Sequence, residues 1–372
     1  MKHYDVAVVG GGPAGAATAR ELSRQGVRVA LLERERLPRY KTCGGGLVHR
    51  ALRYGELDAS TVAERVCNSA ALYLHDIGKR FTARSDFPLI ALTMRDRLDY
   101  QLVEMATAAG AELLTSCRVT GLEQDGGPVR LVTEYGALTA DYLVAADGAL
   151  GEVAKLAGWQ DDRHMIPALE YELPVEDHVM ERFAHEPRFD VGTIPLGYAW
   201  VFPKASHLSV GVLSVQRGAR ALREHFERYL SLLGIPLDAR ATRHGYVIPV
   251  RPRSRLLARG RILLVGDAAG LADPVTAEGI SFALKSGLLA ARAVAEGGGD
   301  VAAAYNAAVL RELYPELKTG RFLAHLVYRR PMIRSALFRA AGQRLTNALT
   351  HVFRGEYGYH DIPARAFRKL VP

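Results

Sequence analysis

The first 33 residues constrain the fold of this chain more than any other stretch. Residues 4–9 (YDVAVV) form a short apolar run, and GGGPAG follows directly. Residues 14–25 then have a helical pattern, and residues 27–33 (VRVALLE) form a second apolar run. This order of strand, glycine turn, helix and strand is typical of the α/β fold that binds dinucleotides.

The glycines of this turn match the pattern G-x-G-x-x-G, and each has a physical role. Gly10 permits the tight turn, Gly12 lets the backbone approach a pyrophosphate, and Gly15 lets the helix pack closely on the strand. The helix N-terminus adds free N–H groups and the positive end of its dipole. Glu33 ends the second strand, where a carboxylate can accept hydrogen bonds from ribose hydroxyls and disfavours a 2′-phosphate. The pattern therefore favours FAD or NAD over NADP.

A second motif, LLVGDAAGLADPVTAEGISFALKSG at Leu263–Gly287, favours FAD over NAD. It reads as a strand, a turn at Gly266 and Asp267, and a loop that enters a helix. Asp267 can bind a ribityl hydroxyl. The N–H groups of Gly279 and Ile280 can face the pyrimidine edge of a flavin, where reduction builds negative charge. Alone, the segment could equally be an ordinary strand–turn–helix, but together with the N-terminal motif it predicts FAD.

The rest of the chain predicts a second domain and a helical end. A helix is expected over 99–109 and strands over 113–120, 129–134 and 142–146. Between residues 166 and 249 short strand-like runs surround one helix at 220–233, and a long apolar helix is expected over 275–295. We expect an α/β (α+β) protein in three parts: a Rossmann-like FAD-binding domain (1–165 and 244–300, with 45–95 contributing in part to the substrate side), a β-sheet substrate domain (166–243), and a helical basic C-terminal region (301–372) that follows the linker EGGGD at 296–300.

Several motifs together resemble a known family. The N-terminal GGGPAG, Asp147–Gly148 and Gly266–Asp267 look like the flavoproteins of the para-hydroxybenzoate hydroxylase fold. Three further stretches resemble the geranylgeranyl reductase family: PRYKTCGGGL (38–47), MRDRLDYQL (94–102) and GYAWVFPK (197–204). The second carries the family pattern R-x-x-[FL]-D, and the resemblance spans residues 3–295. Flavin-dependent halogenases have W-x-W-x-I-P where this chain begins with tyrosine, which argues against a halogenase.

The resemblance implies roles for particular residues. The loop Lys41–Gly46 would pass against the flavin, because glycines allow a close backbone approach; the alternative is a flexible surface loop. Cys43 would lie near the flavin and either donate a proton or pack as a small buried apolar residue. Tyr198 and Trp200 alternate on one strand, so both face one side, where they would line an apolar substrate pocket or simply pack in the sheet.

The resemblance also implies that Arg95 lies near the pyrophosphate or the ribityl chain; the alternative is a solvated arginine at a helix start. It further implies that the backbone of Val119 contacts the adenine. The candidates for catalysis are Cys43, Tyr198 and Trp200. The candidates for cofactor binding are Gly10, Gly12, Ala14, Gly15, Glu33, Arg34, Cys43, Gly44, Gly46, Arg95, Val119, Asp147, Gly148, Gly266, Asp267, Gly279 and Ile280.

Charge is concentrated at the C-terminal end. Residues 311–372 hold twelve Lys and Arg but four Asp and Glu, which accounts for the whole net charge of +8 and suits an anionic partner. Apolar residues recur there every four positions between arginines, as in an amphipathic helix: Ile333, Leu337, Ala341, Leu345 and Leu349. The helix would either pack on the body with a solvated basic face or contact anionic lipid. The sequence has no nucleic-acid-binding motif, and we expect no nucleic acid to bind.

Metals, disulfides and membrane-spanning segments are not expected. The 12 histidines lack metal-ligand spacing, and the three cysteines are widely separated without C-x-x-C. No run of about 18 uninterrupted apolar residues occurs. The N-terminal apolar run could pass for a short signal peptide, but its glycines and Pro13 favour strand–turn–helix. We therefore expect a cytoplasmic protein, which the basic helices would bring to the membrane surface.

These observations predict an FAD-dependent oxidoreductase. The resemblance implies reduction of a C=C bond in an isoprenoid or other lipophilic substrate by hydride transfer from reduced flavin. Because no second G-x-G-x-x-G unit is present, NAD(P)H would dock transiently or a ferredoxin-type donor would serve. Two alternatives stay open: a monooxygenase that hydroxylates an aromatic or polyketide-like substrate, and a non-catalytic flavoprotein that acts as a sensor or partner subunit.

Overall fold

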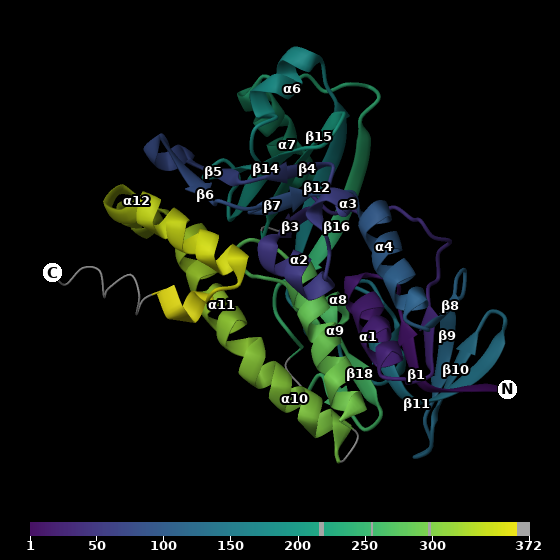
Figure 1. Ribbon diagram of the computed structural model, residues 1–372. Helices are drawn as coiled ribbons and strands as arrows, with labels where there is room; N and C mark the ends of the chain where they lie inside the picture. The colour runs from purple at the N-terminus through teal and green to yellow at the C-terminus, as the bar shows by residue number, and fades with distance from the viewer. Residues whose placement is uncertain (216–218, 254–255, 297–298, 363–372) are drawn as a thin grey trace. The chain divides into compact units, whose positions relative to one another are not determined.

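The protein consists of two compact units, each built from three separate segments of the chain. The computed structural model describes residues 1–215, 219–253, 256–296 and 299–362 (Figure 1). Unit 1 comprises Met1–Lys41, Arg95–His164 and Pro249–Leu317, and unit 2 comprises Thr42–Met94, Met165–Ile248 and Lys318–Pro372. Each unit has its own sheet and its own core.

Unit 1 contains an eight-stranded sheet whose central strands are parallel and buried. The strand order is β17-β18-β11-β1-β2-β8, and the antiparallel pair β10 and β9 adjoins β11. Its strands are β1 (Lys2–Val9), β2 (Val29–Leu32), β8 (Glu112–Leu114), β9 (Val119–Glu123), β10 (Val129–Thr133), β11 (Gly136–Ala145), β17 (Ala258–Arg259) and β18 (Ile262–Leu264). The parallel strands β2, β1, β11 and β18 confirm the α/β class predicted from the N-terminal motif.

The helices of unit 1 follow from the glycine motifs at the strand ends. They are α1 (Pro13–Arg24), α4 (Arg95–Ala108), α5 (Val153–Leu156), α8 (Gly266–Ala269), α9 (Ile280–Ala295) and α10 (Val301–Glu312). In Figure 1, α1 lies beside α9, and the contact is close because the facing residues Ala14 and Gly287 are small. The Thr18 hydroxyl donates to the Gly287 carbonyl oxygen at 3.2 Å, which fixes the two helices at this point.

Several boundaries differ from the sequence prediction, and β11, expected over 142–146, begins at Gly136. The helix predicted from residue 99 begins at Arg95, four residues earlier. The strand predicted over 113–120 was wrong: β8 and β9 are separate strands, and Ser116 between them has a left-handed φ of 52°. The helix predicted from residue 275 begins at Ile280, because polar side chains hold the preceding segment in a loop.

Unit 2 contains a seven-stranded sheet in the order β16-β12-β15-β14-β13-β5-β6. Its strands are β5 (Ser69–Leu74), β6 (Lys79–Arg84), β12 (Met165–Pro174), β13 (Arg188–Val191), β14 (Gly197–Pro203), β15 (His207–Ser214) and β16 (Thr242–Pro249). One face packs against α6 (Asp177–Phe183) and α7 (Ala219–Leu233) in a core that includes Val201, Val210 and Phe226. The sequence predicted α7 but missed α6, whose seven residues are too few for a clear periodic pattern.

The remaining elements of unit 2 are short or C-terminal. A three-stranded sheet contains β3 (Gly46–Val48), β4 (Arg65–Cys67) and β7 (Ile90–Leu92). The helical elements are α2 (His49–Gly55), α3 (Ala59–Val62), the 3₁₀ helices η1 (His75–Ile77) and η2 (Tyr359–Asp361), α11 (Tyr314–Arg329), whose first residues belong to unit 1, and α12 (Pro331–Arg354). The last two helices carry the basic stretch predicted from the sequence.

The apolar stripe predicted for the C-terminal helix is divided by a kink. Ala341 has non-helical dihedrals (φ −141°, ψ 21°) inside α12. Around this kink the helix packs against β6, where the Phe338 and Phe81 rings lie 5.7 Å apart and Gly342 gives the Phe81 ring room. Gly297 and Gly298 of the expected linker, and Arg365, Arg368 and Lys369 of the basic end, lie outside the described residues.

Candidate cofactor site in unit 1 and aromatic face of unit 2

The glycine turn after β1 is built for a close backbone approach. Gly10 has a φ of 112°, and a Cβ there would overlap the carbonyl oxygen of Ala146. A Cβ on Gly15 would overlap the carbonyl oxygen of Gly10. Gly12 is different: the nearest atoms to its would-be Cβ are guanidinium nitrogens of Arg95 and Arg39, 3.9 and 4.0 Å away. The space beside Gly12 is therefore open and bordered by cationic groups.

Gly12 is also the N-cap of α1, and no side chain caps this helix. A helix N-terminus without a side-chain cap presents backbone N–H groups and positive potential. Together with the two guanidinium groups, this arrangement suits the pyrophosphate of a dinucleotide.

A buried ion-pair network supports this turn. Glu33 is 3% exposed, and its carboxylate accepts hydrogen bonds from the N–H of Gly11 at 2.9 Å and from the Arg39 guanidinium at 3.2 Å. Arg39 also donates to Asp99 at 2.9 Å, and Asp99 accepts two hydrogen bonds of 2.8 Å from Arg95. Burial lowers the pKa of Arg39, but the charges of Asp99 and Glu33 outweigh it and raise that pKa. The network fixes both guanidinium groups near the glycine turn.

Sequence reasoning missed Arg39 and Asp99. Asp99 could have been found, because it is four residues after Arg95 on one helix and occupies the final position of the family pattern already recognised. Arg39 lies in the stretch PRYKTCGGGL that resembles the family, but no role was predicted for it. Arg34, which was predicted, is exposed and pairs with Glu35 at 3.6 Å, outside the network.

Asp147 organises the loop that follows β11. Its Oδ2 accepts a hydrogen bond from the Val153 N–H at 2.9 Å, and its carboxylate fills the space where a Cβ on Gly151 would lie. Its Oδ1 is buried without a hydrogen-bond partner among the described residues, and burial raises the pKa of Asp147. Gly148 follows at the turn of the same loop.

The structure brings the second motif together at the N-terminus of α9. Gly266 donates its N–H to the Ser286 hydroxyl oxygen at 2.9 Å. The Oδ1 of Asp267 lies 3.4 Å from the position that a Cβ on Gly279 would take. Gly279 is the N-cap of α9 without a side-chain cap, and Ile280 is the first residue of the helix. The predicted residues Asp267, Gly279 and Ile280 therefore lie close together.

The loop before α9 is held by its own polar side chains. Asp273 accepts hydrogen bonds from the Val275 N–H at 2.7 Å and from the Thr276 hydroxyl at 2.9 Å. Ala277 has a left-handed φ of 56°, which a helix excludes. Glu278 accepts the Ser281 N–H at 2.7 Å and so satisfies one N–H of the first turn.

A single buried arginine links the loops of both motifs. Arg163 donates to the carbonyl oxygens of Asp267 at 2.7 Å and Ala149 at 2.9 Å. It also forms two hydrogen bonds of 2.7 Å with Asp161. No sequence pattern predicts this role, because the guanidinium donates to backbone oxygens far along the chain. Val119, predicted to contact adenine, is buried at the start of β9.

In unit 2, the glycine run 44–46 packs against aromatic side chains. A Cβ on Gly44 would lie 3.0 Å from the Trp200 Nε1 and 3.1 Å from the Phe202 ring. Gly46 is equally close to Phe202. Gly45 has a φ of 67°, and a Cβ there would overlap the Thr93 carbonyl oxygen. The run is therefore a packed segment, and these contacts explain why three glycines follow Cys43.

The strand β14 presents one aromatic face. Tyr198 and Trp200 lie on the same side with ring centroids 6.0 Å apart, as predicted, and Phe202 continues the row at 6.3 Å. The Trp200 indole has room because Gly211 lies opposite it on β15. Its Nε1 is buried without a hydrogen-bond partner among the described residues. Phe189 packs edge-on against Phe202 at 5.3 Å and extends the face to β13.

The three cysteines are not bonded to one another. Cys43 is half-buried, and its Sγ accepts a hydrogen bond from the Gly45 N–H at 3.4 Å. Cys67 and Cys117 are buried, and burial raises the pKa of Cys67 to about 11. Cys43 therefore differs from the other two in accessibility.

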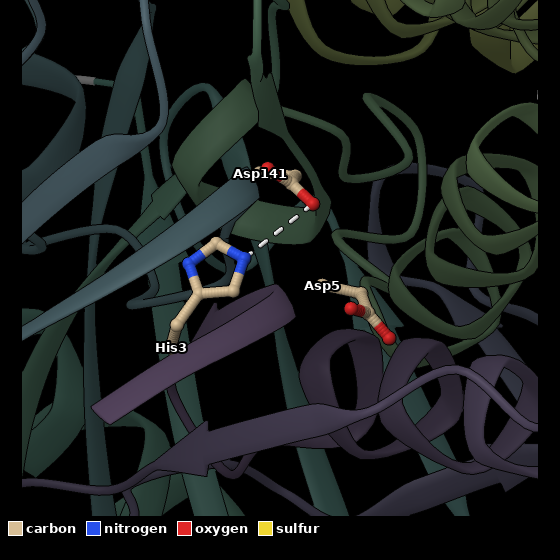
Figure 2. Close-up of side chains that lie close together, drawn as sticks. All are labelled: His3, Asp5 and Asp141. Atoms are coloured by element: carbon tan, nitrogen blue, oxygen red, sulfur yellow. Dashed lines mark ion pairs between the residues drawn. The ribbon is translucent and has the colours of Figure 1, made fainter.

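One group of potential metal ligands occurs among the described residues, at the edge of unit 1. Figure 2 shows His3, Asp5 and Asp141, with His3 Nε2 3.7 Å from the Asp141 carboxylate. Asp5 is already paired with Arg28 at 2.6 Å, and the His3 Nδ1 lies 3.0 Å from the Thr139 hydroxyl. These partners account for the group, and we assign no ion to it.

Comparisons with known proteins identify the family to which the chain belongs. Residues 3–297 match the model of a family described as FAD binding domain. The chain is 30% identical over 321 residues to a chloroplastic geranylgeranyl diphosphate reductase of Nicotiana tabacum, a match that covers 80% of this chain and 67% of the tobacco protein. The chain is therefore an FAD-binding flavoprotein of an oxidoreductase class. Within that class it belongs to the geranylgeranyl reductase family.

Solved structures show the same fold. A geranylgeranyl bacteriochlorophyll reductase-like protein from Thermoplasma acidophilum superposes with a TM-score of 0.80 at 23% identity, covering 99% of this chain and 96% of that one. The flavin-dependent brominase Bmp2 has a TM-score of 0.74 at 18% identity, with 99% of each chain covered. The fold thus carries more than one flavin chemistry. No helix in the described part of the chain is long and apolar enough to cross a membrane.

Proposed function

We propose that this protein is an FAD-dependent reductase of C=C bonds in an isoprenoid or other lipophilic substrate. The observation that carries the proposal is the aromatic face of β14, formed by Tyr198, Trp200 and Phe202, against which the segment that follows Cys43 packs. Family membership supports it, because relatives such as the tobacco protein are named for reduction of geranylgeranyl diphosphate.

Unit 1 would hold the cofactor. The N-terminus of α1, Arg39 and Arg95 would bind the pyrophosphate, and Glu33 the ribose hydroxyls. The N–H groups of Gly279 and Ile280 would receive the pyrimidine edge. The other predicted contacts remain part of this proposal: Gly10, Ala14, Gly15, Arg34, Val119, Asp147, Gly148, Gly266 and Asp267 in unit 1, and Cys43, Gly44 and Gly46 in unit 2.

Unit 2 would bind the substrate and complete the proton balance. When bound, reduced FAD supplies a hydride, with NAD(P)H or a ferredoxin-type protein as the external electron source. The rings of Tyr198 and Trp200 would bind the apolar chain and exclude water. The Cys43 thiol, which is half-buried, would donate the proton that the second carbon needs.

Anaerobic photoreduction tests this proposal. The purified flavoprotein is reduced and mixed with geranylgeranyl lipids, and separately with air. We expect the lipid to reoxidise the flavin and to gain two hydrogens per C=C bond. If the lipid has no effect and O₂ gives coupled hydroxylation of an aromatic compound, the protein is a monooxygenase. Bound FAD without turnover by any donor and substrate would instead indicate a non-catalytic flavoprotein.

We also propose that α11 and α12 bring a cytoplasmic protein to an anionic membrane. Large apolar side chains are exposed on these helices: Phe322 is 62% exposed, Met332 86% and Ile333 45%. The arginines at 329 and 330 are exposed at the junction of the same helices. Apolar insertion with basic neighbours is the pattern of interfacial membrane binding, and it would bring the enzyme to a lipophilic substrate.

A further inference from the structure

A buried cluster of ionisable side chains lies beside the aromatic face and has no role in the cofactor site. Glu170 and Glu172 lie two residues apart on β12, so their side chains share one face of the sheet. Glu170 is opposite Gly211, which in turn is opposite Trp200 on β14. The carboxylates are therefore on the same face as the Trp200 ring.

Lys204 ties this cluster to the glycine run. Its side chain is fully buried, and its Nζ donates to the carbonyl oxygens of Gly44 at 2.8 Å and Thr93 at 2.7 Å. Burial lowers the pKa of Lys204, whereas Glu172 and Glu170 raise it. An ammonium in such a place needs these carboxylates, since an unpaired buried charge is strongly destabilising.

Glu170 is the innermost member of the cluster. It is 1% exposed, and one of its oxygens accepts a hydrogen bond from the Ser209 hydroxyl at 2.6 Å. Burial raises the pKa of Glu170 to about 7, and the charge of Glu172 adds to this shift. Ser209, Lys204 and the backbone N–H of Cys43 act in the opposite direction. Glu170 is thus a buried carboxyl group with a raised pKa, and it accepts a hydrogen bond from the backbone of Cys43.

Glu172 connects the cluster to a more accessible group. Its Oε2 lies 2.9 Å from the Nε2 of His207, whose side chain is 17% exposed. This approach is not an aligned hydrogen bond, and neither oxygen of Glu172 has a hydrogen-bond partner among the described residues. The titratable and polar groups that face the two carboxylates come from every neighbouring element: Cys43, Trp200, Lys204, His207, Ser209 and His244.

We propose that His207, Glu172 and Glu170 form a proton path that supplies Cys43. The inference rests on the proposed function, in which the thiol gives its proton to a substrate carbon. Glu170 then gives its proton to the Cys43 thiolate, so that the thiol re-forms and a carboxylate remains. Glu172 and His207 return a proton to Glu170 from solvent. No electrons move within the path, and Lys204 is a positioning residue that also stabilises the carboxylate.

The first test needs no turnover. The FAD-loaded protein is treated with iodoacetamide from pH 5 to 9, and the alkylation rate of Cys43 is followed by mass spectrometry. The wild-type alkylation rate should show an inflection near pH 7 from Glu170, because an ionised carboxylate disfavours the thiolate. Glu170→Gln should lose this inflection. Glu64→Gln is the matched control: it removes a carboxylate that accepts the Ala205 N–H but lies off the path, and it should retain the inflection.

A wild-type profile without an inflection near pH 7, or a Glu170→Gln profile that keeps it, overturns the proposal whether or not the protein reduces a lipid. The second test uses repeated turnovers with dithionite as the electron donor, because the thiol needs a new proton only after its first turnover. Glu170→Gln should slow lipid reduction about 100-fold without changing the KM. His207→Asn changes a partly exposed residue and should also slow turnover. Added imidazole should restore the rate of this variant. Unchanged rates in both variants would also refute the path, whereas a wild type without lipid reduction would refute the proposed function only.

Discussion

Replacement of Gly45 by alanine should destabilise unit 2 far more than an ordinary glycine substitution. Gly45 has a φ of 67°, where an L-residue costs about 1–2 kcal/mol. A Cβ would also overlap the Thr93 carbonyl oxygen and lie 2.8 Å from the Lys204 Nζ. To relieve this overlap, the Thr93 carbonyl oxygen must move away from the Lys204 ammonium that donates to it. A hydrogen bond to a charged group contributes about 1.5–3 kcal/mol to stability. With the loss of both hydrogen bonds of Lys204 added to the backbone cost, we expect a total loss of about 4–8 kcal/mol.

Gly78→Ala is the matched control in the same unit. Gly78 has a similar φ of 60°, but nothing lies within 4 Å of its would-be Cβ. The free energy of unfolding of Gly78→Ala should therefore fall only by the backbone cost of about 1–2 kcal/mol. Urea unfolding of the FAD-loaded protein in a Trp159→Phe background measures both, because Trp200 then reports on unit 2 alone. If Gly45→Ala loses no more stability than Gly78→Ala, the glycine run is not held as the structure indicates.

Three further predictions concern the cofactor, the thiols and the membrane. Glu33→Gln should weaken FAD binding about 10- to 100-fold, measured by fluorescence titration, because it removes a charged acceptor for the ribose; Glu35→Gln, at an exposed position, should leave affinity unchanged. Iodoacetamide at pH 8 should label Cys43 before Cys67, since the raised pKa of about 11 keeps the Cys67 thiol protonated until well above that pH; equal labelling would contradict the buried position of Cys67. Met332→Asp should reduce co-sedimentation with vesicles that contain phosphatidylserine and leave FAD content unchanged, whereas wild-type protein that ignores such vesicles would refute membrane contact.

The predictable parts of the structure depend on local rules. The glycine turn after β1 and the start of α1 follow from the steric demands of Gly10 and Gly15, which any chain with this turn must meet. The shared face of Tyr198 and Trp200 follows from the period of a strand. These features need only a few neighbouring residues, and the sequence therefore predicts them.

The unpredicted parts depend on contacts between distant segments or on competing side chains. Arg39 and Arg163 each have a partner nearby in the sequence, but their bonds to Asp99 and to the Asp267 carbonyl oxygen span 60 and 104 residues, which no local pattern can indicate. Helix α9 begins at Ile280 and not at the predicted residue 275, because Asp273 accepts hydrogen bonds from the N–H groups of the residues after it. Apolar periodicity therefore did not determine the helix boundary. Lys204 was part of a recognised motif, but its burial among carboxylates depends on β12, a strand from elsewhere in the chain.

The interleaved construction of the two units has a consequence for synthesis on the ribosome. The parallel sheet of unit 1 needs β11 and β18, so it cannot be completed until Leu264 has left the ribosome. The sheet of unit 2 pairs β5 with β13, which is made more than a hundred residues later. Neither unit can fold first as a vectorial domain, and long-range pairing of this kind is slow. Nascent chains should therefore depend on chaperones until nearly the whole polypeptide has emerged, and no single truncation should yield either unit alone.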